Sequence, residues 1–270
     1  MASASIDQNK VLSYIEKRRN GDGGYNFARV EPSGGQDTYF AVLIYDLFGL
    51  TPPDKGRVVD FMDKLYLDNV FQGPVGIYRY AKTLKTLGGE LESREIIDKI
   101  NRFKNKQGGY GLGREVYIEI YSELEATFYA VQTILLLGDL LDKDELKNYT
   151  LSYRNSDGGF GSNGFSTIPT TYYALSTLLS IGEADEARQS IDYLRQKESA
   201  KGSHFMENVY WTVESLTELN EGISRKDKII EFVKNCQRDD NFGFRRSPNG
   251  GISTFEYTYC AIKILRDLDK

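Results

Sequence analysis

The residues best suited to chemistry stand in the stretch Glu123-Leu124-Glu125-Ala126-Thr127, at the predicted start of a helix. Two carboxylates two positions apart can share one proton, and apolar surroundings favour the protonated form. A carboxylic acid held in this way can act as a general acid. The alternative is structural, because acidic residues near a helix N-terminus are stabilised by the helix dipole. The residue types allow both interpretations.

Aromatic residues form a second group, and they occur in pairs at the predicted starts of helices. Their faces attract cations, each contact contributing about 0.5–2 kcal/mol, so they could stabilise a carbocation in a cavity. They could also stack on sugars beside paired carboxylates, as a glycosidase requires. We expect one member of each pair to pack between helices instead. The candidates for substrate binding are Tyr39, Phe40, Phe128, Tyr129, Tyr172, Tyr210, Trp211 and Tyr257.

The chain that positions these residues is built from internal repeats. Asp157-Gly158-Gly159-Phe160 is a glycine-rich turn, and the helix that follows is expected to run from Pro169 to Gly182. An amphipathic segment precedes the turn. Repeats of this length indicate a stacked or closed array of helical hairpins. Further copies of the turn start at Gly21, Gln107 and Asp239, and weaker copies start at Gly73 and Lys201.

Six pairs of one amphipathic and one more apolar helix predict two concentric layers, with the apolar helices inside. The predicted fold is therefore all-α: an α/α barrel of six helical-hairpin repeats, in one domain over residues 1–270. An open solenoid is the alternative, but it requires capping repeats with a polar outer face. Neither end of the chain looks like such a cap. A closed ring requires the helices Ile6–Arg19 and Phe255–Leu268 to lie side by side.

Composition narrows the functional classes. The chain has 270 residues, of which 40% are hydrophobic, so it can bury a large core. Its net charge of −5 argues against a nucleic-acid partner. We find neither a signal peptide nor an apolar run long enough to span a membrane, and we expect a cytoplasmic protein. The cysteines Cys236 and Cys260 are expected to be reduced thiols.

The repeat resembles that of protein prenyltransferase β subunits and of squalene and terpene cyclases. The resemblance rests on a G-G-[FY]-G turn, as in Gly158-Gly159-Phe160-Gly161. This turn is followed by a helix start such as Thr171-Tyr172-Tyr173-Ala174. It recurs in at least four repeats and covers nearly the whole chain. The resemblance implies an (α/α)6 toroid whose central cavity binds an isoprenoid or another apolar small molecule. The resemblance to prenyltransferase β subunits also implies a possible partner subunit.

The zinc ligands of the prenyltransferases are replaced in this chain. The resemblance implies a D-x-C motif and a histidine, but these positions correspond to Glu207-Asn208-Val209 and Tyr257. The one histidine, His204, lies three residues before Glu207, and we expect it to be structural or solvent-facing rather than a ligand. Zinc requires thiolate, imidazole or carboxylate ligands. We therefore expect no zinc and no other cofactor, and the sequence leaves magnesium open.

Basic residues for a diphosphate are also few. Glu125 stands where the prenyltransferases carry an arginine, and a histidine of that family is missing from the fourth inner helix. Positive charge remains on the second inner helix, where Arg79, Lys82 and Lys85 are spaced by three. This stripe could line the cavity or form a solvated helix face. Arg79 and Lys82 are taken as candidates for substrate binding.

The stretch around Glu125 is similar to the D-x-D-D-T motif of proton-initiated, class II terpene cyclases. Glu125 falls at the middle Asp, the proton donor, and Asp37 of Gln36-Asp37-Thr38 matches the last Asp. The departures are Glu for Asp at two positions and Ala126 for a third Asp. The resemblance predicts zinc-independent cyclisation or isomerisation of a polyprenyl substrate, with Glu125 as acid and Glu123 or Asp37 in support. The alternatives are a diverged prenyltransferase β-type subunit and a toroid that only binds a lipid or a partner protein.

Overall fold

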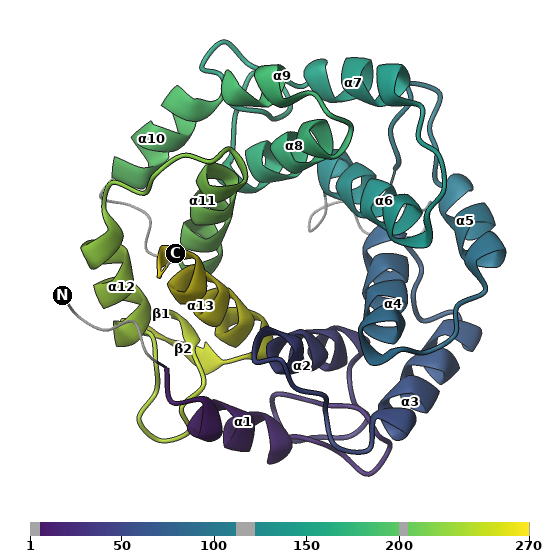
Figure 1. Cartoon of the computed structure of the whole chain (residues 1–270), viewed down its shortest axis with the longest axis vertical. Coiled ribbons are helices and arrows are strands. Elements are labelled where there is room, and N and C mark those ends of the chain that lie inside the picture. The colour runs from purple at the N-terminus through teal and green to yellow at the C-terminus, as the bar shows by residue number, and fades with distance from the viewer. Residues whose placement is uncertain (1–5, 112–121, 200–204, 270) are drawn as a thin grey trace.

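The computed structural model describes residues 6–111, 122–199 and 205–269, and its helices form two concentric rings (Figure 1). The prediction of an all-α barrel of six helical hairpins is confirmed. The inner ring consists of α2 (Gly35–Leu47), α4 (Pro74–Leu87), α6 (Glu123–Leu137), α8 (Ile168–Ser180), α11 (Met206–Glu218) and α13 (Phe255–Leu268). The outer ring consists of α1 (Gln8–Glu16), α3 (Lys55–Leu67), α5 (Ser93–Asn101), α7 (Lys143–Leu151), α10 (Ile191–Ser199) and α12 (Lys226–Asn235).

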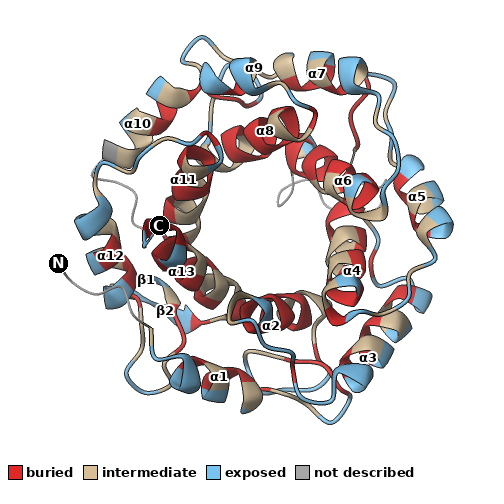
Figure 2. Cartoon of the chain, in the orientation of Figure 1, coloured by how far each residue is buried: buried red, intermediate tan, exposed pale blue. Residues whose placement is uncertain are grey.

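Burial separates the two rings, as Figure 2 shows. In α2 every residue from Thr38 to Tyr45 is buried, because the helix packs against α4, α13 and α3. In α5 the buried residues are Ile96 and Ile100, on one side of the helix. The apolar helices therefore lie inside and the amphipathic ones outside, as their sequence patterns predict.

The glycine turns are tied to the inner helices by a repeated hydrogen bond. In each of the four strong repeats, the backbone N–H of the buried aromatic residue donates to a threonine hydroxyl in the first turn of the inner helix. This contact satisfies a backbone donor that would otherwise be buried unpaired. The four pairs are Tyr25 with Thr38 (3.0 Å), Tyr110 with Thr127 (2.9 Å), Phe160 with Thr171 (3.0 Å) and Phe244 with Thr258 (3.1 Å).

The glycine before each of these aromatic residues packs against a ring of the next outer helix. A Cβ atom would lie within 2.1–2.9 Å of that ring, so a larger residue cannot be accommodated without movement. In the last repeat the ring belongs to α1, so the same contact joins the end of the chain to its beginning. The pairs are Gly24 with Phe61, Gly109 with Tyr149, Gly159 with Tyr193, and Gly243 with Tyr14.

Further contacts close the ring between the first and the last repeat. The ring centroids of Tyr14 and Phe255 lie 5.7 Å apart, and Arg266 Nη1 donates to the carbonyl oxygen of Leu47 at 3.1 Å. The ring therefore closes as predicted, but the last helix packs along α2 and touches the first helix α1 through the Tyr14–Phe255 contact, because α1 belongs to the outer ring. Among the described residues, no helix combines the length and the apolar character needed to cross a membrane.

Two short features depart from the sequence-based expectation. The helix α9 (Ala184–Arg188) interrupts the connection between α8 and α10. The strands β1 (Arg245–Ser247) and β2 (Gly250–Ser253) form an antiparallel hairpin before α13. The two residues between the strands, Pro248 and Asn249, are common turn residues, a signal that the helical repeat pattern obscured.

Candidate functional site

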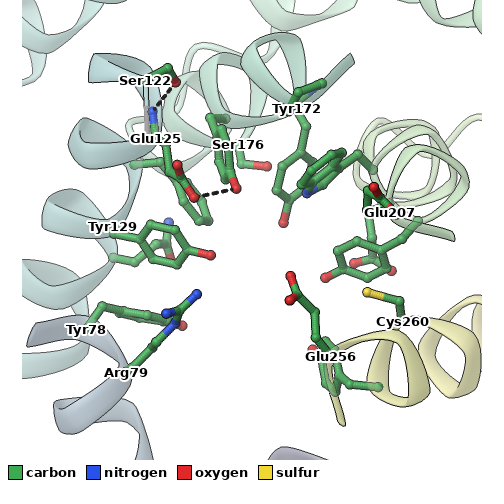
Figure 3. Close-up of a pocket in the computed structure, with 18 of the residues that line it drawn as sticks. Tyr78, Arg79, Ser122, Glu125, Tyr129, Tyr172, Ser176, Glu207, Glu256 and Cys260 are labelled. Atoms are coloured by element: carbon green, nitrogen blue, oxygen red, sulfur yellow. Dashed lines mark hydrogen bonds between the residues drawn. The ribbon is translucent and has the colours of Figure 1, made fainter. Parts of the chain in front are cut away.

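The inner ring encloses a cavity of about 1070 Å³, part of whose wall is drawn in Figure 3. The residues of the wall come from all six inner helices. A cavity of this size can hold a ligand of many atoms. On each inner helix the aromatic residues of the wall begin four or five positions after the first helical residue. The six helices therefore start at the same end of the cavity, which we call the helix-start end.

Eight aromatic side chains form a closed circuit around the cavity, which we call the aromatic belt. Consecutive ring centroids are 5.0–6.3 Å apart, a normal spacing for packed aromatic pairs. Tyr173 and Trp211 also lie in the wall and contact each other at 6.1 Å. The belt runs in the order Tyr39, Tyr78, Tyr129, Phe128, Tyr172, Tyr210, Tyr259, Phe40 and back to Tyr39.

The belt corrects two expectations about aromatic residues. Both members of each pair line the cavity, because neighbouring positions on an inner helix both face the lumen. The expectation that one member of each pair packs between helices instead is not met. Tyr257 is not part of the described wall, and Tyr259, two residues later, takes its place in the belt. Two residues correspond to about 200° around a helix, so these two tyrosines point in different directions.

A layer of polar residues lies one helical turn before the belt, at the helix-start end. Its members are Gln36, Glu125, Glu207 and Glu256, each three positions before a belt residue. Residues three apart lie on the same face of a helix. We call these four residues the polar layer, and its three carboxylates therefore face the lumen directly beside aromatic rings.

Glu125 is the buried acid of this layer. The N-cap residue Ser122 accepts a hydrogen bond from the backbone N–H of Glu125 at 3.1 Å, which fixes the first turn of α6. The Glu125 side chain lies against the cavity, and its Oε1 accepts a hydrogen bond from the Tyr173 hydroxyl at 2.8 Å. Burial raises the pKa of Glu125 from 4.5 to about 7, although Tyr173 and Arg79 oppose this shift. Glu125 is therefore substantially protonated near neutral pH.

Glu123 does not share a proton with Glu125, contrary to the expectation. Its Oε2 accepts hydrogen bonds from the hydroxyls of Tyr149 (2.9 Å) and Tyr153 (2.8 Å), which belong to α7 and to the turn that follows it. Residues two apart on a helix do not face each other. Glu123 therefore joins the inner ring to the outer ring, and Glu125 faces the lumen.

Asp37 likewise lies outside the described wall of the cavity. Its Oδ2 accepts a hydrogen bond from the backbone N–H of Phe27 at 3.2 Å, which ties the first glycine-rich loop to α2. Burial raises the pKa of Asp37. The structure thus gives Asp37 a role in holding the loop and does not bring it into contact with Glu125.

Arg79 reaches the lumen, and Lys82 does not. Arg79 Nη1 donates to Oε1 of Gln36 at 2.9 Å, and Gln36 Nε2 donates to Oε2 of Glu256 at 3.0 Å. Gln36 thus connects the guanidinium group to a carboxylate across α4, α2 and α13. Burial raises the pKa of Glu256, and the charge of Arg79 opposes that shift. Lys82 is half-buried outside the cavity wall, and Lys85 is exposed.

Glu207 stands where the resemblance implied a zinc ligand, and its surroundings do not suit zinc. Its Oε1 forms an ion pair with Arg246 of β1, and a guanidinium group competes with a metal for that oxygen. In the described ranges, no group of three or more His, Cys, Asp or Glu side chains is arranged to hold a metal ion. Tyr257 lies outside the wall, and His204 lies outside the described residues.

A second polar cluster lies deeper in the cavity, roughly 10 Å along α11 from Glu207. Lys263 Nζ contacts Glu214 Oε1 at 2.7 Å and also reaches Asp267. Burial, followed by the neighbouring Asp267 carboxylate, raises the pKa of Glu214 to about 8. Oε2 of Glu218 accepts a hydrogen bond from the Ser176 hydroxyl at 2.7 Å.

Sequence reasoning missed three of the carboxylates that face the cavity, although a signal for each exists. Glu214 and Glu218 stand four positions apart in a helix that the repeat assigns to the inner ring, where charged residues are unusual. Glu256 occupies the second position of α13, as Glu207 does in α11. An alignment of the inner helices by their first residues would have placed both in the polar layer.

Comparisons with known proteins agree with this architecture. Residues 1–73, 57–204 and 187–270 each match the model of the prenyltransferase alpha-alpha toroid domain. The structure is similar to that of Candida albicans protein geranylgeranyltransferase-I complexed with GGPP, with a TM-score of 0.75 and 14% identity over 97% of this chain and 91% of that chain. A search among curated proteins gave no match. The matches to the domain model cover the sequence from end to end, and the chain therefore belongs to the prenyltransferase alpha-alpha toroid family.

Proposed function

We propose that this protein is an isoprenoid-handling enzyme that starts cyclisation or isomerisation of a polyprenyl chain by protonation, with Glu125 as the acid and without zinc. The observation that carries the proposal is the position of Glu125, a carboxyl group buried in the wall of an aromatic cavity. Such a group combines a transferable proton with a position beside aromatic rings.

The proposed step follows from the hydrogen bonding of Glu125. Because the Tyr173 hydroxyl donates to Oε1, the acidic proton resides on Oε2. A double bond of the substrate takes this proton, so that its π electrons form the new C–H bond and a carbocation remains. Loss of a neighbouring proton to the resulting carboxylate regenerates the acid and yields an isomer of the substrate. No oxidant, reductant or leaving group is required.

The aromatic belt supports the second part of the proposal. A carbocation in the lumen would lie among the faces of several rings, and each face can contribute about 0.5–2 kcal/mol of cation–π attraction. The ring contacts also fix the orientation of the side chains before a substrate binds. Preorganised groups stabilise a developing charge without the cost of reorganisation.

A diverged prenyltransferase β-type subunit is the second candidate function. The observation that favours it is the similarity of the fold to that of protein geranylgeranyltransferase-I over most of both chains. Such a subunit would associate with a partner subunit and would transfer a prenyl group. The replacement of the zinc-type ligands by Glu207 and Tyr257 counts against it.

The test is an assay of the purified chain with polyprenyl alcohols and diphosphates, followed by mass spectrometry of the products. The proposal predicts products that are isomers or cyclised forms of the added compound. Products that consist of a prenyl group attached to a protein would instead support the second candidate. Binding of the polyprenyl compounds without any product would identify the chain as a binding protein.

A further inference from the structure

We propose that the cavity selects a polyprenyl chain that carries an ammonium head group, and that it excludes a diphosphate head group. The inference rests on the proposed function in one respect, since it takes the apolar part of the ligand to be an isoprenoid. The head group is inferred independently, from the charges and hydrogen-bonding groups of the cavity wall.

The first observation is the excess of carboxylates over cations in the wall. The described wall contains five glutamates and, as its one basic residue, Arg79. Arg246 and Lys263 pair with Glu207 and Glu214 from outside the wall. Glu125 is substantially protonated near neutral pH, which leaves Glu218 and Glu256 against Arg79. A diphosphate carries several negative charges and would face Glu207 and Glu256 at the helix-start end. Like charges at close range in a partly buried site repel strongly, because water screens them less than at a surface. A cation is attracted by the same groups.

The second observation is an acceptor that lacks a donor. Arg246 binds Oε1 of Glu207, but Oε2 of Glu207 is shut off from solvent and has no hydrogen-bond partner in the part of the chain that the structure describes. Buried acceptors are normally paired, so a ligand that donates a hydrogen bond to this oxygen, once the Glu207 side chain turns toward the lumen, would satisfy it. An ammonium group supplies N–H donors, and a fully ionised diphosphate supplies only acceptors.

The third observation is the placement of aromatic rings beside these carboxylates. Glu207 lies one turn before Tyr210, and Glu256 lies one turn before Tyr259. The rings of Tyr210 and Tyr259 contact each other at 6.1 Å, which brings the two carboxylates to adjacent positions of the wall. In Figure 3 the Glu256 carboxylate points toward the centre of the cavity. Carboxylates together with aromatic faces form the kind of surface that binds an ammonium ion.

The experiment compares three ligands that share one polyprenyl chain and differ in the head group: a primary amine, an alcohol and a diphosphate. Binding to the full chain is measured by calorimetry at neutral pH, below the concentration at which the ligands aggregate. We expect the amine to bind about tenfold more tightly than the alcohol, and the diphosphate to bind at least about tenfold more weakly than the alcohol.

Variants test whether the carboxylates cause this order of binding affinities. Glu207→Gln and Glu256→Gln are each expected to reduce the preference for the amine over the alcohol by about fivefold or more, with the affinity for the alcohol changed less than about twofold. Glu231→Gln removes the same charge from an exposed position on α12 and serves as the matched control, with no change in the order.

The outcomes separate the inference from the proposed function. If the alcohol binds and the diphosphate binds as tightly as the amine, the inference is overturned and the isoprenoid proposal stands. A preference for the amine that persists unchanged in both variants also overturns the inference, because the carboxylates are then not its cause. If none of the three ligands binds, the isoprenoid proposal fails, and the inference fails with it.

Discussion

The Tyr173 hydroxyl donates a hydrogen bond of 2.8 Å to Oε1 of Glu125, and both side chains are buried in the wall of one cavity. The bond crosses from α8 to α6, so it holds the carboxyl group in one orientation toward the lumen. Burial raises the pKa of this group, and the hydrogen bond opposes the rise. The balance between the two determines the pH range in which Glu125 carries a proton.

The stability of the protein is expected to depend on pH through Glu125. Its pKa is about 7 in the folded chain, against an ordinary value of 4.5. Between these values the folded state binds more protons than the unfolded state, so the contribution of Glu125 to stability falls as pH rises from about 4.5 to about 7. Glu125→Gln should therefore stabilise the protein by up to about 3 kcal/mol at pH 8, and the gain should shrink toward pH 5.

Urea unfolding of both proteins at pH 5 and pH 8 measures this difference. The glutamine keeps an oxygen that can accept the hydrogen bond from Tyr173, so the comparison isolates the charge. An effect of Glu125→Gln that is equal at the two pH values would show that the carboxyl group is not held protonated by burial.

Tyr173→Phe should raise the pKa of Glu125 above about 7, because the hydroxyl favours the ionised carboxylate. Arg79 of α4 and Glu256 of α13 also act on this carboxyl group and remain in the variant. Carbon-13 NMR of the labelled glutamate carboxyl group follows the titration directly. A merely structural role for Tyr173 would change stability and leave this pKa in place.

The closure of the ring can be tested at Gly243. A Cβ atom there would lie 2.6 Å from Tyr14 of α1. Gly243→Ala should destabilise the fold by about 1–3 kcal/mol, the usual range for overpacking. Gly222→Ala is the matched control, because a Cβ atom at Gly222 meets nothing within 4 Å. Equal unfolding free energies for the two variants would contradict the packing of the last repeat on the first.

The metal content is predicted from the residues at the zinc-type positions. Because Glu207 is paired with Arg246 and Tyr257 lies outside the described wall, the protein should purify without stoichiometric zinc. A strong chelator should leave its melting temperature unchanged. Elemental analysis measures the zinc content, and one tightly bound zinc per chain would restore the prenyltransferase interpretation.

The fold could be predicted from the sequence because each repeat carries its own signals. The glycine turn, the threonine that accepts its backbone N–H and the apolar run that follows recur with little change. The closure of the ring could be inferred from the number of repeats. The contact between Gly243 and Tyr14 is of the same kind as the glycine–aromatic contacts that join neighbouring repeats elsewhere in the ring. Local pattern and global fold therefore agree.

The candidate site could be predicted only in part, because sequence spacing does not fix side-chain direction by itself. Glu123 and Glu125 are close in sequence and point to opposite sides of α6. Tyr257 and Tyr259 differ in the same way. Glu214 and Glu256 come from other repeats, and their approach to the lumen depends on ring closure. The direction of each of these side chains follows from its position within its inner helix. It can therefore be predicted only when the first residue of that helix is known.

The most direct measurement of the central claim is the turnover of a polyprenyl substrate by Glu125→Gln, with Glu123→Gln as the matched control. Both variants remove one carboxylate from the first turn of α6, but only Glu125 faces the cavity. Glu125→Gln is expected to abolish turnover and nearly retain substrate binding, whereas Glu123→Gln should keep turnover close to that of the unmodified protein. Turnover that survives in Glu125→Gln would contradict the assignment of Glu125 as the acid.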